Sequence, residues 1–283
     1  KGNILPNLAE YELINDTTYE FKVIKGIKWH NGDELKANDI AFTMKKGCET
    51  AITKYIWGAI DPDSIEIIDE YTLRVSTFEP APALLALMTA LPASILNEKY
   101  VTEVGDGSGT APIGTGPYKF VEWSRGNSIT LERFDDYHGE TPDVSKVVFR
   151  FIPEATNRTI ELESGICDLA YEIQTSDLSR VADNPDLTLF SGISNSVRYI
   201  GFNCQKAPFD NVAVRQAIAS AINIEGIVNA VKMGKGVVAT NPIAPDIKYF
   251  NDDIKLRPYN PEGAKAALAA AGYSNGLSTT IWV

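Results

Sequence analysis

The stretch GTGPYKFVEW, residues Gly114–Trp123, lies near the middle of the chain and decides how the surrounding sequence is interpreted. A dinucleotide-binding loop would need a third glycine where Lys119 stands, and a helix directly after the loop to hold the phosphate. The residues that follow, Tyr118 to Phe120, are typical of a strand instead. The stretch therefore predicts a tight turn that enters a strand, with Gly114 and Gly116 supplying backbone freedom and Pro117 stiffness.

Composition bounds the class of protein. The chain has 283 residues, 44% apolar and 22% charged, which is typical of a globular protein of more than one domain. Its net charge of −11 argues against a nucleic-acid partner, because phosphate binding needs a concentrated basic face. No run approaches the roughly 18 apolar residues of a membrane helix.

The chain shows no pattern typical of a catalytic or metal site. Its two histidines, His30 and His138, lie far apart, and Cys48, Cys167 and Cys204 have no CxxC spacing, so we predict no metal site. The disulfide state of these cysteines stays open. His30 stands between Trp29 and an Asn-Gly turn, which favours a hydrogen-bonded turn residue. We expect no catalytic residue and no cofactor.

Apolar alternation predicts the elements of the first half. Strands are expected over residues 19–24, 64–68 and 71–76, the last two forming a hairpin, and a short helix over 84–88. A longer helix is expected to open at Asn38 and Asp39, with an N-cap at Asn38. Residues 101–110 are rich in Gly, Asp and Ser and predict a loop at a domain boundary.

The second half predicts an alternation of strands and helices. Strand 146–152, helix 154–163 and strand 168–173 form an expected right-handed βαβ unit. The other expected strands are 128–133, 187–190, 197–203 and 278–283, and the other expected helices are 176–182, 212–222, 224–232 and one that starts at Asn260-Pro261 and continues to 271.

Six motifs in order resemble the extracellular solute-binding proteins of the dipeptide, oligopeptide and nickel ABC importers, solute-binding family 5. The resemblance runs nearly end to end, although family members are longer at both ends, and the chain looks like an internal piece. The motifs are Ile4-Leu-Pro-Asn-Leu-Ala-Glu10; Tyr19 to Gly32 with Ala37-Asn-Asp-Ile-Ala-Phe42; Pro112-Ile-Gly-Thr-Gly-Pro-Tyr118; Ser164-Gly-Ile-Cys-Asp168; Asn203 with Ala207 to Ile218; and Pro261 to Tyr273.

The resemblance implies an α/β fold, periplasmic-binding-protein-like of type II, with mixed sheets in several domains and truncated at both ends. Residues 1–111 resemble the family's extra domain. Residues 112–203 resemble the central part of the first ligand-binding lobe, and residues 204–283 the start of the second.

The resemblance also implies a function. The chain would be a monomeric, extracytoplasmic component of an ABC importer that captures oligopeptides or dipeptides and delivers them to a permease. Contact with the membrane would come only through a lipid anchor or that permease. Three alternatives stay open: a nickel or nickel-chelate binder of the same family, a hydrolase or transferase with an unrecognised site, and a chemoreceptor-linked or structural surface protein.

Ligand contacts are expected at three places, although the family's main anchors would lie outside this sequence. The first is the loop after a cleft-edge strand, the second a hinge-side strand, and the third a stretch of the extra domain. The residues are Tyr171, Glu172, Ile173 and Gln174; Asn195, Ser196 and Tyr199; and Met88 and Leu91.

Overall fold

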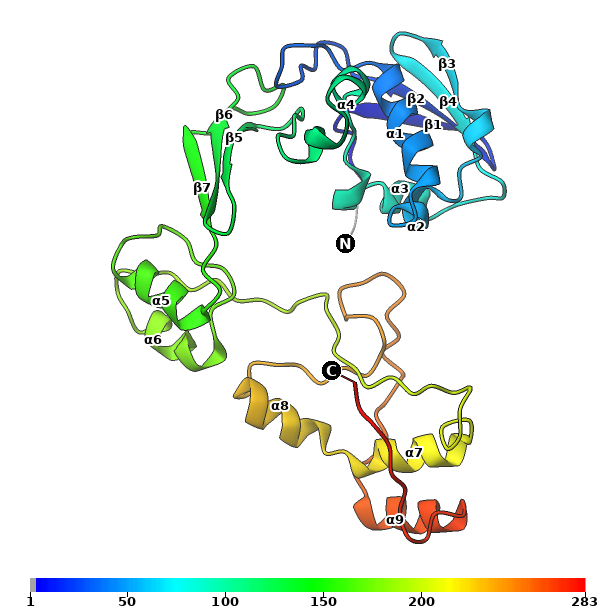
Figure 1. The fold of residues 1–283 in the computed structure, drawn as a ribbon. Coiled ribbons are helices and arrows are strands. Elements are labelled where there is room, and N and C mark those ends of the chain that lie inside the picture. The colour runs from blue at the N-terminus through cyan, green and yellow to red at the C-terminus, as the bar shows by residue number, and fades with distance from the viewer. Residues whose placement is uncertain (1–3, 283) are drawn as a thin grey trace. The chain divides into compact units, whose positions relative to one another are not determined.

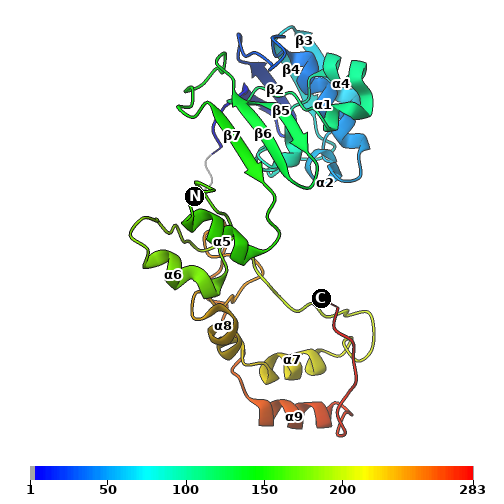
Figure 2. The ribbon, with the colours of Figure 1, turned by 60° about the vertical axis from the view of Figure 1, so that its left-hand side comes forward.

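The computed structural model describes residues 4–282, which divide into two compact units between residues 153 and 154. Figures 1 and 2 show the ribbon from two directions. Each unit is described by itself.

The first unit begins with a four-stranded antiparallel sheet in the order β1-β2-β4-β3. Its strands are β1 (Ala9–Asn15), β2 (Thr18–Val23), β3 (Glu66–Asp69) and β4 (Thr72–Ser76). The expected strand 19–24 and the expected hairpin are confirmed, whereas β1 was not anticipated. Its two-residue connection to β2 is closed by the Asn15 side chain, which accepts the Thr17 and Thr18 N–H groups.

Helix α1 (Ala37–Glu49) lies against one face of this sheet, as Figure 1 shows. Every second side chain of β2 and β4 faces α1, and the side chains of α1 that recur every three or four residues face the sheet. These two apolar faces pack together to form a core. The short helices α2 (Lys54–Trp57) and α3 (Leu84–Leu87) complete it. The buried side chains include Phe21, Trp29, Leu35, Ile40, Met44, Trp57, Leu73 and Val75.

The Asp39 carboxylate joins three segments inside this core. It is only 4% exposed, and it accepts the Trp29 indole N–H at 3.3 Å and the Glu98 backbone N–H at 2.9 Å. It also accepts the Lys36 N–H at 3.1 Å, which caps α1. Burial holds the pKa of the Asp39 carboxyl group above its ordinary value, and these three donors only partly offset that effect. The N-cap expected at Asn38 is therefore wrong. Lys36 is the N-cap residue, and the side chain of Asp39, three residues later, accepts its backbone N–H.

Residues 98–109 are helical, and the expected loop there is wrong. Helix α4 (Glu98–Val104) starts where the Asn97 side chain accepts the Tyr100 N–H, and a 3₁₀ turn, Gly105–Gly109, follows. Glycine and aspartate in this segment indicated a loop. However, the Asn97 cap and the contact of Glu98 with α1 stabilise a helical turn that composition does not show.

A second antiparallel sheet, β5-β6-β7, follows in the same unit: β5 (Tyr118–Ser124), β6 (Ser128–Arg133) and β7 (Lys146–Arg150), drawn side by side in Figure 2. Phe120 pairs with Leu131, and Trp123 with Ile129. Ile129 pairs in turn with Phe149. Pairs directly across a sheet share one face, so this sheet has a continuous apolar face.

The second unit is helical. Helix α5 (Ala155–Glu163) lies beside α6 (Leu178–Ala182), which follows the 3₁₀ turn Thr175–Asp177. Two contacts join them: the Thr159 hydroxyl donates to Asp177 at 3.2 Å, and Arg180 pairs with Glu163 at 3.0 Å. Helices α7 (Val212–Ala221) and α9 (Pro261–Ala270) lie side by side, joined by the Asn260 N–H to the Ser220 carbonyl. Helix α8 (Ile224–Lys232) lies between them in the chain.

All of these helices were expected, and Asn260 caps α9 as predicted, accepting the Gly263 N–H at 2.9 Å. Five expectations about strands in the second half are wrong in the described residues. Segments 168–173, 187–190, 197–203 and 278–282 form no strand, and β7 belongs to an antiparallel sheet, so there is no βαβ unit. Residue 283 lies outside the described residues. Alternation marks a segment able to pair, but a strand exists only where a neighbour supplies hydrogen bonds.

Removing the Asp39 carboxylate tests its role in the first unit. Asp39→Ala leaves three N–H donors without their acceptor, and we expect a loss of about 3 kcal/mol in the free energy of unfolding. Chemical denaturation followed by Trp fluorescence measures it. The matched control is Asp106→Ala on the exposed 3₁₀ turn, with an expected change within about 0.5 kcal/mol. Equal effects of the two substitutions would contradict the role of Asp39.

Candidate functional site

A hollow of about 560 Å³ lies in the first unit, where the loop before β5 meets the β5-β6-β7 sheet. Its floor is apolar, formed by the face that carries Phe120, Trp123, Ile129 and Leu131. Its rim is formed by His30 and by residues of the loop before β5, including Pro112, Ile113, Gly114 and Gly116. Apolar walls with a few fixed polar groups are typical of small-molecule and peptide side-chain sites.

His30 holds the rim through three hydrogen bonds. Its backbone N–H donates to the Gly114 carbonyl at 2.9 Å, and the Gly114 N–H donates to its Nδ1 at 3.1 Å. Its Nε2 lies 3.0 Å from the Gly116 carbonyl oxygen, and its ring meets Phe134 edge-on at 5.0 Å. The expectation that His30 is a hydrogen-bonded turn residue is confirmed. Its partners lie more than 80 residues away, so no local spacing identifies them.

The environment of the ring favours the neutral form. Half-burial lowers the pKa of His30 below its ordinary value, the bond to Gly116 opposes this, and the positive charge of Lys119 lowers it further. At neutral pH the imidazole is therefore uncharged, and it holds the loop through these hydrogen bonds.

The two glycines of this loop do not use the backbone freedom that the sequence suggested for them. Neither Gly114 nor Gly116 has a positive φ, and Pro117 follows a trans bond. A Cβ at Gly114 would meet the His30 ring at an ordinary 3.6 Å, and one at Gly116 would meet nothing within 4 Å. The turn is thus held by His30 and not by a conformation that only glycine adopts.

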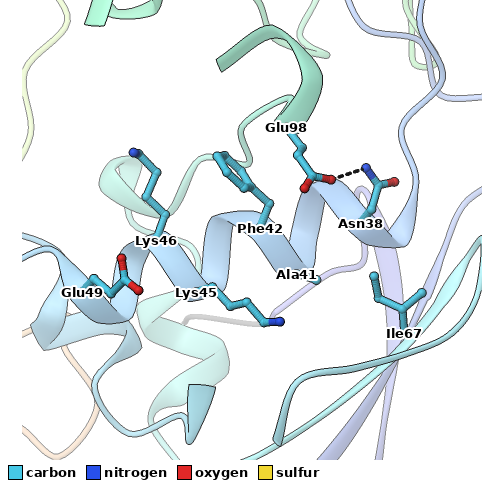
Figure 3. A pocket seen from close by; sticks show the side chains of 8 residues that line it. All are labelled: Asn38, Ala41, Phe42, Lys45, Lys46, Glu49, Ile67 and Glu98. Carbon is cyan, nitrogen blue, oxygen red and sulfur yellow. Dashed lines mark hydrogen bonds between the residues drawn. The ribbon is translucent and has the colours of Figure 1, made fainter. Parts of the chain in front are cut away.

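A smaller hollow of about 330 Å³ lies on the outer face of α1, shown in Figure 3. Asn38 donates to Glu98 at 2.7 Å at one end, and Lys45, Lys46 and Glu49 surround the other. Long, mobile charged side chains form most of this wall, so it offers little fixed geometry for recognition.

The residues expected to contact ligand in the second unit lie in extended, exposed segments. Tyr171 is 77% exposed, and Glu172 has a φ of 58° while its carbonyl oxygen accepts from Arg158 at 3.0 Å. Ile173 is half-buried and Gln174 precedes the 3₁₀ turn before α6. Asn195 and Ser196 are exposed, and Tyr199 is 85% exposed.

The two residues expected in the first unit differ from one another. Met88 ends α3 and packs partly against the core, whereas Leu91 is 90% exposed. The assignment of these nine residues as ligand contacts stays a prediction.

Residues 4–282 offer neither a metal-binding cluster nor a membrane-spanning helix. No group of three or more His, Cys, Asp or Glu side chains in the described part of the chain has a geometry that could hold a metal ion. Among the same residues, no helix is long and apolar enough to cross a membrane.

The sequence model of the bacterial extracellular solute-binding proteins, family 5, middle region, matches residues 3–283. The chain belongs to this family. Its members are substrate-binding proteins and not enzymes, and they work outside the cytoplasm, which gives the chain an extracytoplasmic location.

Curated relatives agree with the family. The chain is 33% identical to heme-binding protein A of Haemophilus influenzae and 32% identical to the dipeptide-binding protein of Escherichia coli K12. Each match covers 99% of this chain but only 56% and 57% of the relative, so the chain spans just over half their length.

Among solved structures, the periplasmic binding protein DppA of Helicobacter pylori, in complex with the peptide STSA, superposes with a TM-score of 0.86. The two are 28% identical, and the match covers 96% of this chain and 58% of that one. The expected fold class, periplasmic-binding-protein-like of type II, is confirmed, although both sheets of the described residues are antiparallel and not mixed.

Alanine substitutions separate the two kinds of glycine in the first unit. Gly116→Ala places a methyl group in open space at an ordinary φ, and we expect unfolding free energy within about 0.5 kcal/mol of the parent or slightly higher. Gly26→Ala, also in open space but with a φ of 83°, should lose about 1 kcal/mol. Thermal denaturation of both variants measures the difference, and a larger loss at Gly116 would contradict the His30-held turn.

Proposed function

We propose that this protein is the substrate-binding component of an ABC importer that captures oligopeptides or dipeptides outside the membrane and delivers them to a permease. The observation that carries the proposal is the superposition of nearly the whole chain on a binding protein with a bound peptide. The similarity to a dipeptide-binding protein supports the same ligand class. The protein acts as a monomer and catalyses no reaction on its ligand.

The domain assignment from the resemblance accompanies this proposal. Residues 1–111 form the extra domain, residues 112–203 the central part of the first lobe and residues 204–283 the start of the second. A cleft between two lobes suits a transport protein, because closure around the ligand couples binding to a shape that a permease can read.

The proposed ligand contacts are mostly exposed aromatic and polar side chains of the second unit, with two apolar residues, Met88 and Leu91, from the first. Tyrosine suits peptide recognition because its ring supplies contact area at low entropic cost while its hydroxyl bonds to the peptide backbone. Tyr171 and Tyr199 are the strongest candidates, since both rings are free of the protein core. Glu172 and Gln174, Asn195 and Ser196 supply acceptors and donors, and Ile173, Met88 and Leu91 supply apolar contact.

A thermal-shift screen tests the ligand class. It uses the complete natural protein that contains this chain, because the curated relatives are longer than the chain. A pool of two- to five-residue peptides should raise the melting temperature by several degrees, since a ligand at about 100 times its Kd stabilises the folded state by about 2.7 kcal/mol.

Haem, a nickel–histidine chelate and a sugar mixture are the parallel arms of that screen. Stabilisation by haem or the chelate, with none by peptides, would replace the peptide assignment within the same family. Turnover of a peptide or ester, abolished by substituting one acid or base, would contradict the assignment to a binding protein.

Two tyrosine substitutions test the site. In the complete natural protein, Tyr171→Ala and Tyr199→Ala should each weaken peptide binding about tenfold, the equivalent of about 1.4 kcal/mol, measured by titration calorimetry. Both side chains are exposed, so the melting temperature without ligand should not change. Tyr55→Ala, a 59% exposed tyrosine on α2, is the matched control and should bind like the parent. Unchanged affinity in both variants would place the ligand elsewhere.

A further inference from the structure

The His30 ring and its bonds to Gly114 and Gly116 join the turn after Trp29 to the loop that enters β5. We propose that this contact is a proton-operated latch: the neutral ring holds the loop, and protonation of the ring releases the Gly114 N–H and loosens the rim of the 560 Å³ hollow. The proposal concerns regulation of the loop and does not depend on the identity of the transported ligand.

The hydrogen bonds define which nitrogen carries the proton. The Gly114 N–H is a donor, so His30 Nδ1 must be an acceptor with a free lone pair. The Gly116 carbonyl oxygen is an acceptor, so His30 Nε2 must carry the hydrogen. The ring is therefore the neutral Nε2–H tautomer, with each nitrogen matched to one backbone group of the loop.

Protonation breaks one of these matches. Imidazolium carries hydrogen on both nitrogens, so Nδ1–H would face the Gly114 N–H at the present 3.1 Å. Two donors cannot share that position, and an N–H shielded from water without an acceptor is costly. The Nε2–H bond to Gly116 and the bond from the His30 backbone N–H to the Gly114 carbonyl survive, so the loop stays attached at both glycines while the Gly114 N–H turns away from the ring.

The charged and titratable groups around the ring do not favour the imidazolium form. On β5, Lys119 adds positive charge near the ring, and Tyr118 lines the same hollow. On β6 and the turn after it, Phe134 presents its ring edge, and the loop from Pro112 to Pro117 carries no charged side chain. Four carboxylates of these elements pair with cations: Glu132 with Lys119, Asp135 with Arg133, Asp136 with Lys28, and Asp33 of the His30 turn with Lys99. Glu122 is the carboxylate of β5 itself.

The direction of the pH response follows from the lowered pKa of His30. A histidine in the unfolded chain titrates near about 6.5, and burial places the folded value below that. The stability that the latch contributes is therefore complete above about pH 6.5 and is lost as the pH falls through the folded pKa. A protein outside the cytoplasm is exposed to such acid conditions directly.

Nuclear magnetic resonance of the full chain tests the latch between pH 4.5 and 8. The His30 ring carbons and the Gly114 amide nitrogen should titrate with one shared midpoint below about 6.5. The protection of the Gly114 amide against exchange, corrected for the intrinsic pH dependence, should fall about tenfold across that midpoint, while protection in β2 and β4 stays constant.

Two variants complete the experiment. His30→Asn keeps an acceptor near the position of Nδ1 but cannot titrate, so the Gly114 signal should become independent of pH. His138→Asn makes the same change at the exposed histidine that contacts Asn7, and it should leave the Gly114 titration intact. The parent titration decides the question even if His30→Asn fails to fold. A Gly114 amide that ignores the ring titration, or a His30 midpoint above 6.5, would overturn the proposal.

Discussion

The buried Asp39 carboxylate organises the first unit, because a buried charge persists only where donors surround it. Its three donors come from the turn at Trp29, the start of α1 and the start of α4. Fixing Trp29 also fixes its neighbour His30, whose ring and backbone then hold the loop that enters β5. One carboxylate thus links a turn and two helices, and His30 beside that turn extends the link to a distant loop.

The two units differ in how they are stabilised. Residues 4–153 bury a continuous apolar core between a sheet and α1, whereas few of the described apolar side chains of the second unit are buried, namely Val181, Val214, Ala217, Ala244 and Ala264. The residues proposed to contact ligand there, Tyr171 and Tyr199, lie outside that small set of buried positions.

Sequence patterns predicted elements well wherever the determinant was local. The β3–β4 hairpin, the Asn260 cap of α9 and the amphipathic helices all depend on residues within one turn of each other. The failures have two causes. The cap of α1 is local and was misplaced, because the Asp39 side chain reaches back three residues to the Lys36 N–H. The others depend on distant partners: α4 is stabilised by Asp39 across nearly 60 residues, and the absent strands would need neighbours that no alternation specifies.

The sequence by itself determined the family and the helices and hairpins, because ordered motifs and short-range periodicity are written in the chain. It also identified His30 as a turn residue. Only the tertiary structure decided that His30 binds Gly114 and Gly116, that its proton lies on Nε2, and that the glycines of GTGPYKFVEW need no left-handed backbone. Those facts depend on which distant groups meet, and hydrogen-bond partners more than 80 residues apart leave no trace in local spacing.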